Sequence, residues 1–329
     1  MAALQFKSDH NKVAFLEKVE GHEIFDPMVD FLLRTKIRFA LTRYPNMICD
    51  SLVQQFWETT ETRNREGHPT EIVATIDGVE YVVTKSLVRT QLQLDDADGE
   101  YHTNYDVILA GMEDVGYRPD NSKVWCKNKL CPKWRFLVHT LLQCLSPKTG
   151  GWDQFSTDLA CGIVCLSKGI TYNFSRFIFD GMLGNVSAKK HNFLMYPRFL
   201  QIIICIETQN RTHRPVIELS AKLFSTMKTG YNGAHSPLLA AMLPAGNEAA
   251  EERDASDGDN PPSPDAANAG ADASVLAAAD AGTSNAADAN ASADAGDQPL
   301  PSPRPPTPDE GPAISAGVDT VVTLLYYND

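Results

Sequence analysis

Long apolar runs are absent from this sequence of 329 residues. The longest covers about 14 residues, 193–206, and is interrupted by Pro197 and Arg198, whereas a bilayer-spanning helix needs about 20 apolar residues. The N-terminal segment also lacks the apolar stretch of a secretory signal, because charged side chains break it at Lys7, Asp9, Lys12 and Glu17. These absences predict a soluble, intracellular protein, nuclear or cytoplasmic, that is neither secreted nor bound to a membrane.

The cysteines lack the even number and regular spacing of a disulfide framework. The sequence has seven, and several stand inside apolar segments, as reduced thiols in a protein core do. We therefore expect free, buried thiols. One set ends in the spacing of a retroviral zinc knuckle: Cys126, Cys131, His139 and Cys144. However, His139 and Cys144 lie about 140° apart around a predicted helix, so they cannot converge on one ion.

Complete catalytic signatures are missing as well. The sequence contains no nucleophile elbow, phosphate-binding loop or dinucleotide fingerprint. The acidic run 95–100 does not fit a calcium-binding loop, since Leu94 and Tyr105 would stand where acidic ligands are needed. We therefore predict that the protein is not an enzyme and binds no cofactor or metal ion. The alternative is a degenerate transposase or metal-dependent nuclease that uses Asp120, Asp180 and Glu218, whose spacing loosely resembles that of an integrase.

Positive charge is scarce in the last 86 residues, 244–329, which hold two basic and 16 acidic side chains and a net charge of −14. The preceding residues, 1–243, hold 27 basic and 26 acidic side chains. Within them, an acidic half, 1–117, has a net charge of −9, and a basic half, 118–243, has a net charge of +10. The basic half is a candidate footprint for RNA or DNA. An ordinary solvated surface, balanced by the acidic half, is the alternative.

The densest positive charge lies in residues 118–148. Lysine and arginine bind phosphates, and an exposed Trp125 or Trp134 would stack on bases. In the alternative interpretation, Trp134 begins an apolar stripe and the lysines form its solvated rim. The candidate nucleic-acid-binding residues are Lys123, Lys127, Lys129, Lys133 and Arg135.

Large apolar residues are rare in 244–317, which consists mainly of Ala, Asp, Gly, Asn, Ser and Pro. Such a segment cannot bury enough surface to offset the entropy of an ordered chain, so we predict that it is disordered. The proline-rich stretch 299–308 is typical of a stiff spacer, with a ligand for an aromatic groove or a phosphorylation target at Ser302 or Thr307 as alternatives. The last segment, 318–329, is apolar again.

Periodicity predicts helices and one β-hairpin in the acidic half. Apolar residues at helical spacing indicate a helix over 25–33, and Asp50 or Ser51 can cap a second helix. Two strand-like runs flank Asp77-Gly78, the turn dipeptide of a hairpin over 71–83. Thr84 or Ser86 then caps a helix that runs to Leu94, and a further helix covers 105–115.

The basic half is predicted to be mostly helical. Its helices fall at about 134–145, 153–167, 174–184, 197–208 and 220–227, although 202–206 equally fits a buried strand. The sequence therefore predicts an α+β fold. A helix-rich globular body, 1–243, with a β-hairpin near 71–83 precedes a disordered tail.

Several long blocks resemble a plant protein family associated with copia-type LTR retrotransposons. They include residues 1–6, 10–16, 72–94 and 152–155, and three longer blocks with large aromatic residues: 50–57 (DSLVQQFW), 134–146 (WRFLVHTLLQCLS) and 192–201 (NFLMYPRFLQ). The resemblance covers residues 1–243. More remotely, this part of the sequence is similar to the putative plant transposon protein domain. It implies an origin in a transposable element and provides no catalytic residues. We therefore expect a binding or assembly protein for protein partners, with RNA or DNA as a further candidate. A coding-sequence relic without a selected function is the third possibility.

Overall fold

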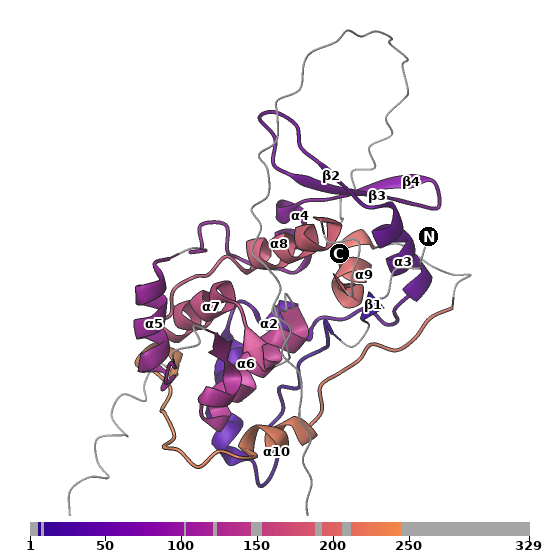
Figure 1. Ribbon diagram of the computed structural model, residues 1–329. Coiled ribbons are helices and arrows are strands. Elements are labelled where there is room, and N and C mark those ends of the chain that lie inside the picture. Colours follow the sequence, from indigo (N-terminus) through magenta and orange to yellow (C-terminus); the bar gives the residue numbers. More distant parts are fainter. Residues whose placement is uncertain are drawn as a thin grey trace, which may run out of the picture. The chain divides into compact units, whose positions relative to one another are not determined.

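The structure of the protein, a computed structural model, describes residues 6–7, 10–101, 103–120, 124–145, 153–187, 193–205 and 212–244. The predicted disordered segment beyond Pro244 and the apolar segment 318–329 lie outside the described residues. Within the described residues the protein is rich in helices and carries a small antiparallel sheet (Figure 1). This confirms the predicted α+β fold class.

The acidic half begins with short helices. Pro27 lies in the first turn of α1 (Asp26–Arg34), where its missing N–H leaves no carbonyl unpaired. The predicted apolar face buries Met28 and Leu32, whereas Leu33 is exposed. The neighbouring helices are η1 (Glu23–Phe25), α2 (Arg38–Thr42) and α3 (Asp50–Thr59).

The capping residue predicted for α3 is wrong. Cys49 occupies the cap position and makes no side-chain capping bond. Asp50 lies inside the helix instead, and both its carboxylate oxygens accept hydrogen bonds from Arg214 Nε, at 2.9 and 2.7 Å. The Asp50 carboxylate therefore binds Arg214, which is distant in the sequence, and does not cap the helix.

The predicted hairpin is confirmed as strands β3 (Glu71–Ile76) and β4 (Val79–Val83). Asp77 and Gly78 have φ angles of 51° and 81°, the left-handed conformation that a type I′ turn requires. A third strand that the sequence did not indicate, β2 (Glu61–Arg63), pairs antiparallel with β3. At three residues it is too short to show an alternating pattern.

Side-chain caps fix the start of two further helices. Thr84 Oγ1 accepts from the backbone N–H of Leu87 at 3.1 Å, which confirms Thr84 as the cap of α4 (Lys85–Gln91). The helix ends before the predicted Leu94. Asn104 caps α5 (Tyr105–Asp114) in the same way.

The basic half contains five helices within the described residues, close to their predicted positions. The start of the predicted 153–167 helix is instead a strand, β6 (Gln154–Phe155), paired with β5 (Trp125–Cys126). Residues 202–204 are helical, so the strand alternative for this run is wrong. The helices are α6 (Pro132–Leu145), α7 (Thr157–Ser167), α8 (Phe174–Ser187), α9 (Pro197–Ile204) and α10 (Lys222–Lys228).

Short pairings join segments that lie far apart in the sequence. Strand β1 (Phe6–Lys7) runs parallel to β7 (Phe193–Leu194), and single bridges connect Val13 with Glu218 and Ile48 with Arg214. Two 3-10 turns, η2 (Lys127–Lys129) and η3 (Ala240–Met242), complete the described elements.

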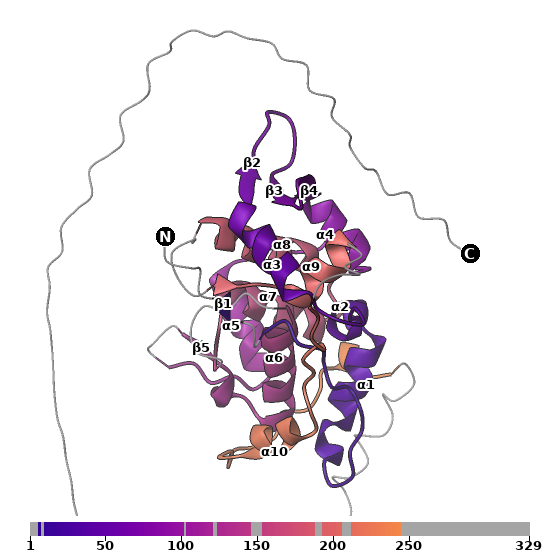
Figure 2. The ribbon, with the colours of Figure 1, turned by 90° about the vertical axis from the view of Figure 1, so that its right-hand side faces the viewer.

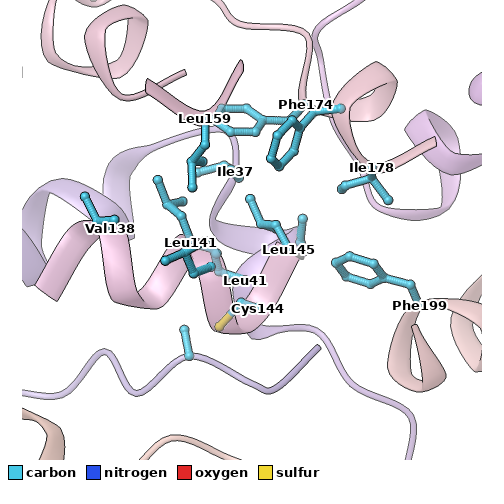
Figure 3. Close-up of a cluster of buried hydrophobic side chains, with 14 of the residues drawn as sticks. Ile37, Leu41, Val138, Leu141, Cys144, Leu145, Leu159, Phe174, Ile178 and Phe199 are labelled. Carbon is cyan, nitrogen blue, oxygen red and sulfur yellow. The ribbon is translucent and has the colours of Figure 1, made fainter. Parts of the chain in front are cut away.

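Helix α6 lies at the centre of the core, which both halves of the body share (Figures 1 and 2). Its side chains Leu141 and Leu145 face Ile37 beside α2, Leu159 of α7 and Phe199 of α9 (Figure 3). The acidic and basic halves are therefore a division of charge along the chain, because their apolar side chains form a single cluster.

Candidate binding cavity

The predicted nucleic-acid-binding residues do not form an exposed basic patch. Lys127 is 5% exposed and its Nζ lies 2.6 Å from Asp153 Oδ1. Arg135 is 6% exposed, and its guanidinium donates to the backbone carbonyls of Leu130, Asn128 and Thr229. Both side chains are engaged inside the fold and have little contact with solvent, and their contact with nucleic acid stays a prediction.

The remaining predicted nucleic-acid-binding residues are paired, half-buried or outside the described residues. Lys129 pairs with Asp120 at 2.6 Å, and Lys133 is half-buried. Lys123 lies outside the described residues. Trp125 and Trp134 are 3% and 0% exposed, so neither ring can stack on a base. Trp134 begins a buried apolar stripe, as the alternative interpretation predicts, but Lys127 is buried and does not belong to a solvated rim.

The three carboxylates of the nuclease alternative lie in unrelated surroundings. Asp120 binds Lys129, and Asp180 accepts a hydrogen bond from the Tyr101 hydroxyl at 2.7 Å. Glu218 is exposed at its bridge to Val13. Among the described residues, no three His, Cys, Asp or Glu side chains could hold a metal ion together. The four residues of the knuckle-like motif all lie in the described part of the chain, and they too form no such group.

The predicted thiol state is only partly correct. The seven cysteines are free, but Cys205 is exposed and Cys126 is half-buried. The other five are buried, and burial raises the pKa of the Cys144 thiol to about 12. Cys205 follows the last turn of α9 in a left-handed conformation, which turns it out of the apolar run.

An open cavity of about 270 Å³ lies within the described residues. Four separate parts of the chain form it: α1 with the turn after it, the loop after α4, the loop between α7 and α8, and the η3 turn. Its walls are mostly apolar. The apolar lining residues are Phe31, Ile37, Leu94, Leu166, Ile170, Phe174, Met242 and Leu243.

Charged groups stand at the rim of this cavity. Lys36 Nζ lies 2.6 Å from Asp95 Oδ2, and both side chains are largely exposed. The Lys36 contact lowers the pKa of the Asp95 carboxyl. Arg34 is also exposed and donates from Nη2 to the carbonyl of Met242 at 2.8 Å. The rim therefore joins α1 to both the loop after α4 and the η3 turn.

Asp96, the one buried carboxylate of the lining, is fully engaged in holding the wall. It accepts from Arg89 Nε at 2.8 Å, from the Ser175 backbone N–H at 2.6 Å and from the Ser175 hydroxyl at 2.7 Å. The acidic run 95–100 is thus a structural loop that caps the start of α8, in agreement with its predicted loop character. Its charge is not available to a ligand.

The sequence did not indicate this cavity, because no single segment contains it. Residues as far apart as Phe31 and Met242 line it, and each appears in the sequence as an ordinary core residue. The acidic run beside Leu94 predicted a loop that lines the cavity, but it gave no indication of the lining residues from other segments.

None of the three comparisons made with known proteins, namely with family models, with characterised proteins and with solved structures, finds a match. Within the described residues, no helix combines the length and the apolar character that crossing a membrane would require.

Proposed function

We propose that this protein is a non-catalytic binding protein, which assembles with a protein partner through the cavity between α1, α7 and η3. The observation that carries the proposal is the cavity itself: apolar walls, an open mouth and a charged rim on one recess. Ligand pockets combine apolar walls with a few placed polar groups in this way. The proposed origin in a copia-type retrotransposon rests on the sequence blocks alone.

The surroundings of the cavity also support a contact with a macromolecule. Ile170 lines the cavity and is 46% exposed, and Leu33 of the adjacent α1 is 38% exposed. These two side chains extend the apolar area around the recess that a partner would cover. Nucleic acid is the weaker candidate, because the basic residues proposed to bind it include buried and paired ones.

A photo-crosslinking experiment tests the proposal. A benzoylphenylalanine placed at Ile170 is expected to capture a discrete protein in cells that express the chain. The Ala241→Phe variant is expected to abolish this capture, because Ala241 lines the cavity and its added ring would occupy the mouth. Ala110→Phe, an exposed change on α5 outside the lining, is the matched control. Equal capture in all three backgrounds would refute the cavity as the binding site.

A further inference from the structure

The rim of the cavity carries more positive than negative charge that a ligand can reach. Arg34 and Lys36 are both exposed lining residues, and Asp95 is the exposed carboxylate of the lining, paired with Lys36. Asp96 is buried and already engaged by Arg89 and Ser175. The mouth therefore offers an anion two cationic groups, whereas a cation would find one carboxylate that already binds Lys36.

Arg34 has hydrogen-bonding capacity to spare. Its guanidinium uses Nη2 on the Met242 carbonyl, and within the described residues Nε and Nη1 have no hydrogen-bond partner. A planar guanidinium with free N–H groups suits a carboxylate, which accepts two parallel hydrogen bonds. The contact with Met242 also orders the side chain at the cavity, which lowers the entropy lost when an anion binds.

The volume limits what can enter. A recess of about 270 Å³ lies just below the range of about 300–1,000 Å³ typical of small-molecule and cofactor sites. At about 30 Å³ per water-sized unit, it accepts about nine non-hydrogen atoms. This matches a hydrocarbon chain of about eight carbons or a single leucine side chain with its backbone atoms.

We propose that the cavity binds a compact apolar group that carries a carboxylate. The apolar part lies against the walls that Phe31, Phe174 and Met242 contribute, and the carboxylate binds Arg34 at the rim. Because the proposed function assigns this cavity to a protein partner, the carboxylate is that of a C-terminal leucine of that partner; a short free fatty acid has the same chemistry, and the peptide probes below separate the two. The inference rests on the proposed binding function and specifies the ligand of the same site.

Calorimetry on the full chain with three eight-carbon probes tests the charge preference. We expect octanoate to bind more tightly than octan-1-ol, and octan-1-ol more tightly than octylamine. An eight-residue peptide ending in leucine, as the free acid and as the amide, identifies the source. Binding of the free acid but not the amide supports a protein C-terminus, and binding of octanoate without the peptide overturns it in favour of a free carboxylate.

Two variants separate recognition from folding. Arg34→Gln is expected to weaken octanoate about tenfold, since it removes a charge-assisted hydrogen bond, and to leave octan-1-ol nearly unchanged. Asp95→Asn is expected to tighten octanoate about two- to fivefold, because it releases Lys36 and removes an opposing charge. A gain of affinity cannot arise from misfolding. Arg65→Gln, an exposed arginine outside the lining, is the control.

The outcomes distinguish this inference from the proposed function. If octylamine or octan-1-ol binds as tightly as octanoate, the carboxylate preference is wrong and the binding cavity stands. If Arg34→Gln leaves the ratio of octanoate to octan-1-ol affinity unchanged, Arg34 is not the carboxylate-binding residue and the inference also fails. If no probe binds while Ile170 crosslinks a partner, the inference falls alone. Failure of both experiments removes the cavity as a binding site.

Discussion

Arg198 is a fully buried arginine whose charge is satisfied by backbone carbonyls. Its guanidinium donates to the carbonyls of Asn11 and Cys144 at 3.0 and 2.9 Å, and to those of Ala40 and Arg43 at 2.9 and 2.6 Å. The carbonyls at the ends of α2 and α6 lack partners within their own helices, so the arginine replaces their missing bonds. Burial lowers the pKa of Arg198 to about 10, and the side chain remains charged at neutral pH.

The first residue-scale prediction concerns this contact. Arg198→Met should lower the free energy of unfolding by at least about 3 kcal/mol, because it leaves several buried carbonyls without a donor. Urea unfolding measures the change, and Arg65→Met, at an exposed site, is the control. A loss below about 1 kcal/mol would mean that water satisfies these carbonyls equally well.

Single residues also show what could not be predicted from the sequence, namely which cations are buried. Lys127, Arg135 and Arg198 add to the net charge as surface cations do, although all three are buried. Their partners are carbonyls or an aspartate brought in by the tertiary fold, as with Asp153 for Lys127. Charge counted along a sequence therefore overstated the basic surface, since it contains no information on which cations the fold itself uses.

At the scale of one element, α6 carries polar side chains into the core. His139 Nδ1, Thr140 Oγ1 and Gln143 Oε1 are buried and have no hydrogen-bond partner within the described residues. Burial, with the positive charges of Lys127 and Lys12 as lesser causes, lowers the pKa of His139 to about 4. The neutral imidazole is therefore the form that the folded protein accommodates.

This gives a prediction for the pH dependence of stability. The pKa of His139 is lower in the folded protein than its ordinary value of 6.5. The contribution of the neutral imidazole to the free energy of unfolding is therefore fully present above pH 6.5 and is lost as the pH falls toward 4. The loss should reach at most about 3 kcal/mol. His139→Leu should flatten the stability curve between pH 6.5 and 4.5, and His68→Leu, at an exposed site, should not. Parallel curves for wild type and His139→Leu would contradict the assignment.

The elements that could be predicted are those with strong local signals. The hairpin at Asp77-Gly78, the Thr84 cap and the long stripe of α6 each depend on a few adjacent residues. The strands β2 and β5 are very short, and their pairing depends on partners elsewhere in the chain. The cavity depends on four segments at once, which is why local pattern could not reveal it.

At the scale of the whole molecule, residues 1–117 and 118–243 are interlocked. The N-terminal Asn11 side chain binds Cys144 and Phe199 backbone groups, and Arg214 binds Asp50. These contacts join the start of the chain to α6 and α9, and the segment after α9 to α3. Neither charge half is therefore a separate domain, and dividing the chain near residue 117 would expose the shared core.

The strongly acidic sequence 244–329 begins directly after a residue of the cavity. Leu243 lines the recess, and the residues that follow it have a net charge of −14. If the site binds a carboxylate at Arg34, this charge opposes the ligand through unscreened repulsion at low ionic strength. A chain ending at Pro244 should then bind octanoate about twofold more tightly than the full chain in about 10 mM salt, where the screening length is about 30 Å. The difference should vanish in about 1 M salt, and octan-1-ol affinity should be the same for both chains. An advantage of the shorter chain that persists at high salt would show that residues 245–329 affect the cavity by a route other than charge.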